Sequence, residues 1–215
     1  LTEAMMTCTR LMPEEHFRPG EGSASERLRT GSIGRPYSFV EVAVRDAEGK
    51  PVPGGEIGEI AIRAEHLMLG YWQKPEETKK VLREGWLASG DLARRDEEGF
   101  IYLMGRNKEM LISGGFNIYP QEVEACLSAC PGVLESAVIG APDPDFGEIA
   151  VAFVASEAGT ALTAELCTAH CKPRLGIKTP KVWRFIEGLP RTPNGKIDKA
   201  LLRRQHLESP GGAHG

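Results

Sequence analysis

The sequence predicts an α+β fold made of a β-rich first part and a second part in which strands and helices alternate. Two stretches indicate the β-rich part, because apolar and polar residues alternate in 39–45 and again in 57–63, with turn-forming residues between them. After Gly105-Arg106 the pattern changes to short apolar runs separated by helix-like segments. We therefore expect domains at 1–105 and 106–208, followed by a flexible tail at 209–215.

The rest of the first part shows the pattern of a short helix and two more strands. Lys74 to Thr78 opens the helix, because Pro75 lies near its first position and acidic residues in the first turn suit the helix dipole. Short strands are expected at 86–88 and 99–103, with Ser89-Gly90-Asp91 at the turn between them.

The second part is expected to form a short mixed sheet flanked by helices. Gly114-Gly115 separates two apolar runs as in the turn of a hairpin, and Thr163 is suited to cap a helix that ends near Leu175. The remaining expected elements are helices at 120–129 and 198–205 and strands at 133–140, 149–155 and 182–186.

The composition is that of a folded globular protein, with 41% hydrophobic and 26% charged residues among 215. No apolar run approaches the roughly 18 to 20 residues needed to cross a bilayer, and no secretory signal opens the sequence. We therefore expect a cytoplasmic location. The five cysteines do not form the framework of a disulfide-rich domain, so reduced thiols are expected.

The charge is unevenly distributed along the chain. Residues 172–204 hold ten lysines and arginines but only two acidic residues, Glu187 and Asp198, whereas the rest of the chain is acidic. A basic segment raises the local concentration of polyanions such as a nucleotide, coenzyme A or a nucleic acid. A solvated basic face without a ligand is the alternative interpretation.

Two common nucleotide-binding motifs are excluded. Gly195-Lys196 lacks the preceding glycine that a phosphate-binding loop requires and is followed by Ile197, and no Gly-x-Gly-x-x-Gly segment occurs. An ordinary NTPase or a dehydrogenase is therefore not expected.

Three other segments each allow a functional and a structural interpretation. Asp91 beside a glycine could accept hydrogen bonds from a vicinal diol or could satisfy the N–H groups of a turn. Gly114-Gly115 could let the backbone run close to a substrate or could simply close a tight hairpin. Lys196 lies on a Pro- and Gly-rich loop and could be a mobile charge for a phosphate or carboxylate, or a solvated surface lysine.

A zinc site at the cysteines is a further hypothesis, which we discount. Cys126 and Cys130, and likewise Cys167 and Cys171 beside His170, are four residues apart and share a helical face. Structural zinc sites more often use closer cysteine pairs on turns, and cysteine is commonly a small buried hydrophobic residue.

In their order along the chain, the motifs resemble those of the adenylate-forming superfamily of acyl-CoA synthetases, luciferases and peptide-synthetase adenylation domains. Thr2-Glu3 is similar to the end of the family's Tyr-Gly-x-Thr-Glu motif, and Ser89-Gly90-Asp91 is similar to Thr-Gly-Asp with one conservative change. The other matching segments are Gly58-Glu59-Ile60, Gly70-Tyr71-Trp72, Pro75-Glu76-Glu77-Thr78, Gly105-Arg106 and Asn194-Gly195-Lys196. The resemblance implies the β-rich end of the family's large N-terminal domain, followed by its small mobile C-terminal domain.

The same resemblance implies an ATP-dependent ligase that activates a carboxylic acid as an acyl-adenylate and transfers the acyl group to coenzyme A. Lys196 would be the catalytic residue, because its charge would offset the charge that develops when the carboxylate attacks the α-phosphate. Thr2, Asp91 and Arg106 would bind the nucleotide, with Asp91 on the ribose hydroxyls. Glu3 would bind the Mg²⁺ that accompanies ATP.

The resemblance also implies roles for the start of the second part. Lys108 would be the hinge about which the small domain rotates between the two half-reactions. Ser113, Gly114 and Gly115 would bind coenzyme A along the passage for its pantetheine arm. The segment 112–120 resembles that of acyl-CoA synthetases more than that of carrier-protein-loading domains.

The expected partners are a small carboxylate, ATP and coenzyme A, without nucleic acid and without a membrane span. The family places a phosphate-binding loop and the acyl pocket before the Thr-Glu motif, so we expect this chain to require the N-terminal portion of the same enzyme and to be inactive alone. Two alternatives stay open: an adenylation domain that loads a carrier protein, and a non-catalytic nucleotide-binding module.

Overall fold

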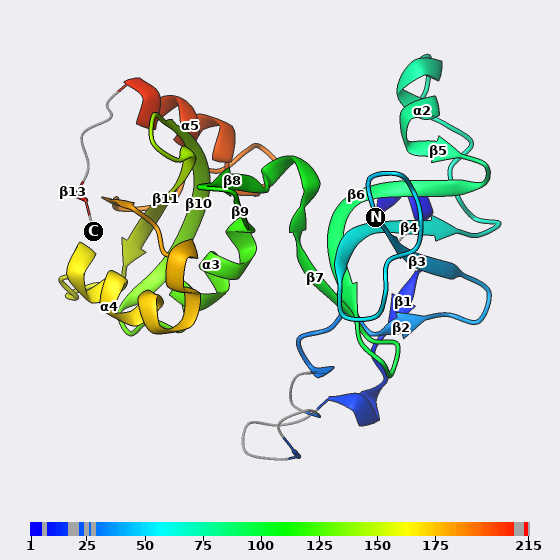
Figure 1. Ribbon diagram of the computed structural model, residues 1–215, viewed down its shortest axis with the longest axis horizontal. Coiled ribbons are helices and arrows are strands. Elements are labelled where there is room, and N and C mark those ends of the chain that lie inside the picture. The colour runs from blue at the N-terminus through cyan, green and yellow to red at the C-terminus, as the bar shows by residue number, and fades with distance from the viewer. Residues whose placement is uncertain (6–7, 17–21, 24–25, 27–28, 209–212, 215) are drawn as a thin grey trace. The chain divides into compact units, whose positions relative to one another are not determined.

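The chain divides between Asn107 and Lys108 into two units, each of which is described by itself. The computed structural model describes residues 1–5, 8–16, 22–23, 26, 29–208 and 213–214. Both units combine sheets with helices, which confirms the predicted α+β class (Figure 1).

The first unit is built on an antiparallel five-stranded sheet. Its strand order is β3-β4-β6-β5, and β7 pairs with the other part of β6. These strands are β3 (Glu41–Arg45), β4 (Ile57–Arg63), β5 (Leu82–Arg83), β6 (Trp86–Arg95) and β7 (Ile101–Arg106). The other elements are β1 (Thr9–Arg10), which pairs with β2 (Arg35–Pro36), the 3-10 turns η1 (Thr2–Ala4) and η2 (Pro13–Glu15), and α2 (Pro75–Val81).

Alternation along the strands determines which face of this sheet is buried. Val42 and Ile60 belong to the core of the first unit together with Leu87 and Ile101, whereas their chain neighbours lie on the opposite face. The helix α2 has no buried residue, and its Glu76 and Glu77 pair with lysines three residues further on. Exposed pairs of this kind contribute little to stability.

The predicted turn at Ser89-Gly90-Asp91 is wrong, because these residues lie inside β6. The pairing of β4 with β6 changes register here: Glu59 is opposite Leu92, whereas Ala61 is opposite Ala88. The extra residues form a β-bulge, and Gly90 has a φ of 75°, a left-handed conformation that favours glycine. The glycine therefore marks a bend within a long strand instead of the end of a short one.

The second unit is built on a mixed sheet. The long strands β10 (Val133–Asp143) and β11 (Gly147–Ser156) pair antiparallel, and β12 (Val182–Phe185) pairs parallel with β11. The parallel pair requires a crossover, which α4 (Ala164–Leu175) and η4 (Gly176–Lys178) provide. The other elements are η3 (Asn107–Glu109), β8 (Leu111–Ser113), β9 (Phe116–Ile118), α3 (Pro120–Ser128), α5 (Lys199–Glu208) and β13 (Ala213–His214).

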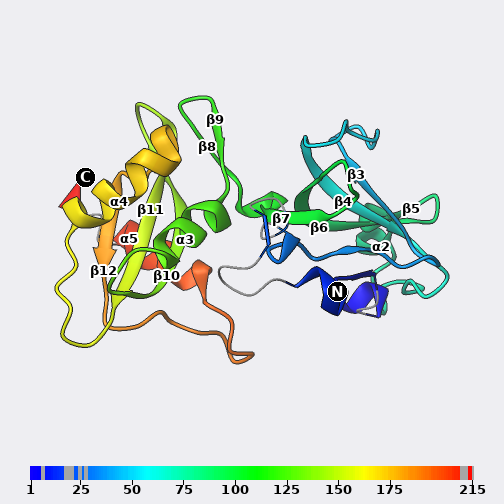
Figure 2. The same ribbon diagram turned by 90° about the horizontal axis from the view of Figure 1, so that it is seen from below.

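Helices cover both faces of this sheet, so the second unit has a core on each side. Leu127 of α3 and Cys171 of α4 are in one core with Val138 of β10. The next residue along the strand, Ile139, is in the other core with Leu202 of α5. Figure 1 shows α5 on one side of the β10–β11 pair and α3 and α4 on the other, and Figure 2 shows the same unit from below.

The cap predicted at Thr163 is present, and part of the predicted tail is described. Thr163 is the N-cap of α4, and its Oγ1 accepts a hydrogen bond from the Leu166 N–H at 3.3 Å. Of the tail predicted to be flexible, 209–212 and 215 lie outside the described residues. Ala213 and His214 form β13, which pairs with β12.

Leu127→Ala should destabilise the second unit by about 2–5 kcal/mol, because a fully buried side chain leaves a cavity in the α3–α4 core. Leu134→Ala is the matched control, since Leu134 is 64% exposed and should cost no more than about 0.5 kcal/mol. Hydrogen exchange of the 133–156 amides in increasing urea measures both changes. Equal effects of the two substitutions would contradict the assigned core.

Candidate functional site

Asp91 and Arg106 lie next to each other on β6 and β7 of the first unit. The two residues are register partners, and Arg106 Nε donates to Asp91 Oδ1 at 2.9 Å. Arg106 Nη2 also donates to the Ser89 carbonyl at 3.4 Å. Both side chains are partly exposed, at 41% for Arg106 and 31% for Asp91, so the aligned carboxylate and guanidinium remain accessible to a polar ligand.

The β-bulge that carries Asp91 is held by Glu59 from the neighbouring strand β4. Glu59 Oε1 accepts a hydrogen bond from the Gly90 N–H at 2.8 Å, and Ser89 Oγ accepts one from the Asp91 N–H at 3.1 Å. The motif pattern predicts no role for Glu59, although this residue lies in one of the motif segments. Its contact joins two motifs that are 31 residues apart.

Among the pockets that the described residues form at the sheet of the first unit, one is lined by Asp91. This pocket, of about 210 Å³, is lined by Asp91 and Ser89 together with Thr9 and the apolar side chains of Val42 and Ile60. Ligand pockets commonly measure roughly 300–1,000 Å³, so the described residues supply only part of a nucleotide-sized site.

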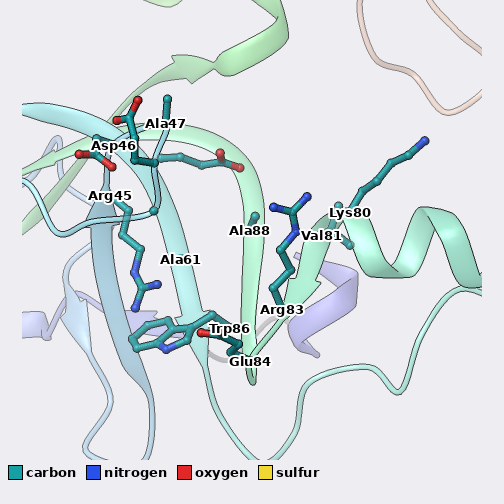
Figure 3. Close-up of a pocket in the computed structure, with 13 residues that line it drawn as sticks. Arg45, Asp46, Ala47, Ala61, Lys80, Val81, Arg83, Glu84, Trp86 and Ala88 are labelled. Atoms are coloured by element: carbon teal, nitrogen blue, oxygen red, sulfur yellow. The ribbon is translucent and has the colours of Figure 1, made fainter.

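A second pocket, of about 450 Å³, is lined by other residues of the same sheet (Figure 3). Trp86 lies beneath the Arg45 guanidinium, whose carbon is 3.9 Å from the ring centroid. Lys80 of α2 and Arg83 of β5 also line this pocket, and Figure 3 shows the Lys80 side chain extending away from Trp86. Although Glu59 contributes to its lining, none of the predicted site residues does, so we assign the candidate nucleotide surface to the pocket that contains Asp91.

Glu3 accepts hydrogen bonds from two residues of the segment 68–71. Tyr71 Oη donates to Glu3 Oε1 at 3.0 Å, and the Met68 N–H donates to the Glu3 carbonyl at 2.8 Å. Thr78 Oγ1 in turn accepts from the Tyr71 N–H at 2.9 Å. Partial burial, and then the neighbouring Glu3 carboxylate, raise the pKa of Tyr71, so the phenol stays protonated and remains a donor.

The Glu3 carboxylate is chemically suited to a hard cation such as Mg²⁺. Within the described part of the chain, no three His, Cys, Asp or Glu side chains gather as a metal site. Mg²⁺ commonly uses only one or two protein carboxylates and completes its shell with phosphate oxygens and water. The single carboxylate of Glu3, next to Thr2, therefore fits a Mg²⁺ ion that is bound together with a nucleotide. It does not fit a metal site whose ligands all come from the protein.

Lys196 lies on an exposed turn between Arg191 and α5 of the second unit. The Thr192 N–H donates to the Lys196 carbonyl at 2.7 Å, and the Gly195 N–H donates to the Thr192 carbonyl at 2.8 Å. Among the residues that the structure describes, the Lys196 ammonium has no partner. The backbone of this loop is thus ordered by hydrogen bonds while the charge at its tip faces solvent.

Glu135 of β10 holds the first stem of this loop through both carboxylate oxygens. Oε1 accepts from the Leu189 N–H at 3.0 Å, and Oε2 accepts from Arg191 Nη2 at 2.6 Å. Arg191 Nη1 also donates to the Gly195 carbonyl at 3.1 Å, directly before Lys196. Glu135 is not predicted from the sequence, because 56 residues separate it from Arg191 and no local pattern links the two.

Gly114 and Gly115 form the turn of the β8–β9 hairpin, as predicted for this segment. Their φ angles are 56° and 84°, and the Gly114 N–H donates to the Phe146 carbonyl at 2.9 Å. A Cβ on Gly114 would lie 3.2 Å from the Phe146 ring, whereas one on Gly115 would meet nothing within 4 Å. Ser113 is buried at the end of β8, opposite Gly147 of β11.

Lys108 is the first residue of the second unit and lies exposed within η3. The predicted site residues therefore belong to two separate sets. Thr2, Glu3, Asp91 and Arg106 are in the first unit, and Lys108, Ser113, Gly114, Gly115 and Lys196 are in the second.

Four cysteines lie inside the α3–α4 core, where the described residues form no group that could hold a metal ion. Cys126 Sγ is 3.9 Å from Cys171 Sγ, and Cys130 and Cys167 are buried beside them. Burial raises the pKa of Cys167 to about 11 and that of Cys171 to about 12. These thiols therefore stay protonated near neutral pH.

Two family profiles match the chain. The profile described as "AMP-binding enzyme" matches residues 1–72, and that described as "AMP-binding enzyme C-terminal domain" matches residues 122–196. The described helices include none that is long and apolar enough to span a membrane.

Curated relatives of the chain are CoA ligases. A sulfoacetate–CoA ligase from Cupriavidus necator is 44% identical over 81% of this chain and 34% of its own length. A medium/long-chain-fatty-acid–CoA ligase from Mycobacterium tuberculosis is 38% identical over 100% of this chain and 37% of its own length. The chain thus spans about a third of the length of these relatives.

Among solved structures, the o-succinylbenzoate CoA synthetase of Bacillus subtilis in complex with its acyl-adenylate intermediate is similar. It is 32% identical, with a TM-score of 0.84 over 99% of this chain and 41% of its own. The similarity therefore extends across both described units.

At pH 8, iodoacetamide should alkylate Cys167 about 100-fold and Cys171 about 1000-fold more slowly in the folded protein than in urea, because only thiolates react. The rate in the folded protein should still rise about tenfold from pH 8 to pH 9, since both pKa values lie above this range. Peptide mass spectrometry measures each site. Equal rates in folded and unfolded protein would contradict the buried, protonated thiols.

Proposed function

Because the chain belongs to the family of AMP-binding, adenylate-forming enzymes, we propose that it is the C-terminal part of an ATP-dependent acyl-CoA synthetase. The observation that carries the proposal is the ammonium of Lys196, which has no partner in the described part of the chain and is displayed on a loop with a hydrogen-bonded stem. Such a charge is available for an anionic reacting group. The relatives, which are named as CoA ligases, supply the reaction class.

In the first half-reaction, a substrate carboxylate oxygen attacks the α-phosphorus of ATP, and pyrophosphate leaves. Lys196 lowers the barrier by offsetting the negative charge around the α-phosphate, without forming a covalent bond. Asp91 accepts hydrogen bonds from the ribose hydroxyls, and Arg106 both orients Asp91 and contacts the nucleotide. Thr2 lies beside the phosphates.

Glu3 would hold the Mg²⁺ that accompanies ATP, and the ion would neutralise phosphate charge when bound. Tyr71 has a positioning role here, because its hydroxyl donates to one oxygen of Glu3. The other oxygen of Glu3 would then be available to hold the metal.

In the second half-reaction, the coenzyme A thiol attacks the acyl carbon of the adenylate, and AMP leaves. Gly114 and Gly115 present backbone without side chains, which gives a narrow pantetheine arm room to pass, and Ser113 lies at the start of this passage. Lys108 is the hinge, because the two units divide at this residue. Rotation at Lys108 would exchange the Lys196 loop for the glycine hairpin.

We also propose the domain boundary, the roles of the site residues and the requirement for the N-terminal portion of the enzyme. The chain alone should form no acyl-adenylate, since the relatives are about three times as long. We propose that the enzyme acts in the cytoplasm, where ATP and coenzyme A are found. Replacing coenzyme A with a phosphopantetheinylated carrier protein in the thioester assay separates this function from carrier loading.

Lys196→Ala in the full-length enzyme should slow adenylate formation by about 10²–10³-fold, because one preorganised charge at the α-phosphate is lost. Pyrophosphate release with ATP and either dodecanoate or sulfoacetate measures this step. Lys172→Ala removes another exposed lysine of the same unit and should leave the rate unchanged. Thioester formation from supplied acyl-adenylate should also persist in Lys196→Ala; loss of neither half-reaction would refute the assignment.

Lys108→Pro should slow thioester formation from supplied acyl-adenylate by about tenfold or more and leave pyrophosphate release largely intact, because a fixed φ opposes the rotation. Lys108→Ala removes the same side chain but keeps the backbone free, so it should behave like the wild type. Stopped-flow detection of acyl-CoA measures the step. If Lys108→Pro and Lys108→Ala make thioester equally fast, Lys108 is not the hinge.

A further inference from the structure

Lys199, three residues after Lys196, forms ion pairs with two carboxylates of the second unit. Its Nζ lies 3.1 Å from Glu109 Oε2 and 2.8 Å from Glu124 Oε1. All three side chains are mostly shielded, with exposures of 23% for Lys199, 34% for Glu109 and 21% for Glu124. Charge-assisted contacts at this level of burial are stronger than those of exposed pairs.

The two carboxylates come from different parts of the unit. Glu109 ends η3 and directly follows the hinge residue Lys108. Glu124 lies on α3, and its Oε1 also accepts a hydrogen bond from the Val138 N–H of β10 at 2.7 Å. Lys199 therefore joins the segment after the hinge to the body of the unit.

Lys199 is also joined directly to the loop that carries Lys196. It is the first residue of α5, and the preceding Asp198 donates its N–H to the Pro190 carbonyl at 2.8 Å, across the two stems of the loop. Asp198 Oδ1 accepts from the Leu201 N–H at 2.9 Å and caps the helix. The second stem is thus fixed by Lys199 and Asp198, as the first is by Glu135.

We infer that Lys199 is a positioning residue for Lys196, and this inference rests on the proposed function. By tying the base of the Lys196 loop to the residue after the hinge, it makes the loop move with the hinge segment as one body. Lys196 then arrives at the α-phosphate in a defined position instead of sampling many. Displacement of a reacting group by about 1 Å can cost about 10²-fold in rate, so such bracing has a measurable kinetic effect.

A second ion pair of the same unit provides a matched control. Lys178 Nζ lies 2.7 Å from Glu122 Oε2, with side-chain exposures of 30% and 31%, close to those of the Lys199 pairs. This pair joins η4 to α3 and contacts no residue of the 189–198 loop. Lys178→Met therefore removes a comparable interaction without changing the loop.

The test compares Lys199→Met, Lys199→Arg and Lys178→Met in the full-length enzyme. Hydrogen exchange of amides 189–198 should become about tenfold faster in Lys199→Met and stay unchanged in Lys178→Met. The kcat of pyrophosphate release, with ATP and whichever of dodecanoate or sulfoacetate the wild type uses, should fall about tenfold in Lys199→Met while the KM for ATP changes less than about twofold. Lys199→Arg should restore kcat to within about threefold, because it keeps the charge.

Unchanged exchange in Lys199→Met would overturn the bracing, and faster exchange with unchanged kcat would overturn its role in positioning. An equal kcat loss in Lys178→Met would also overturn it, since the effect would then reflect general stability. If the wild type releases no pyrophosphate with either carboxylate, the proposed function fails for these acids. Hydrogen exchange still decides whether Lys199 braces the loop, so the two failures remain distinct.

Discussion

In the second unit, the Lys196 ammonium has no partner among the described residues, while the loop around it is held in place. Lys196 is exposed, but both stems of its loop are held. Glu135 binds Arg191 in the stem before Lys196, and Lys199 in the stem after it forms an ion pair with Glu109. An exposed lysine on an unbraced loop would sample many positions, and its attraction for an anion would be offset by the entropy lost on ordering it. Hydrogen bonds and ion pairs that hold both stems reduce the entropy lost when Lys196 binds an anion, and they leave its charge available.

In the first unit, the carboxylate of Asp91 is likewise held in place by contacts from other elements. Asp91 lies on a β-bulge, a feature that redirects a side chain relative to its strand. Glu59 holds the bulge through the Gly90 N–H, and Arg106 holds the carboxylate itself. Asp91 and the Lys196 loop are therefore each held by residues from other elements, so their positions depend on tertiary pairing and not on any one motif alone.

Local patterns predicted much of the fold. The alternation in 57–63 gave the bounds of β4 as observed, and Thr163 caps α4 because its hydroxyl accepts a backbone N–H. The same approach failed at Gly90, since a glycine with positive φ is as compatible with a turn as with a bulge. Only the register of the facing strand distinguishes the two.

The site residues were suggested by motif order, but the residues that hold them were not. Glu135 and Arg191 are 56 residues apart, and Lys199 and Glu109 are 90 apart, so no pattern within a short window could connect them. Glu59 and Tyr71 lie within motif segments, which was the one available signal. Their contacts with Gly90 and Glu3 became apparent only from the folded chain.

The most direct test of the account follows oxygen from the substrate carboxylate. Full-length enzyme is incubated with ATP, coenzyme A and ¹⁸O-labelled dodecanoate or sulfoacetate, and the labelled products are identified by mass spectrometry. Attack on the α-phosphorus predicts that one ¹⁸O atom appears in AMP and that pyrophosphate carries none. Release of ADP with ¹⁸O in inorganic phosphate would show attack on the γ-phosphorus and would contradict adenylate formation.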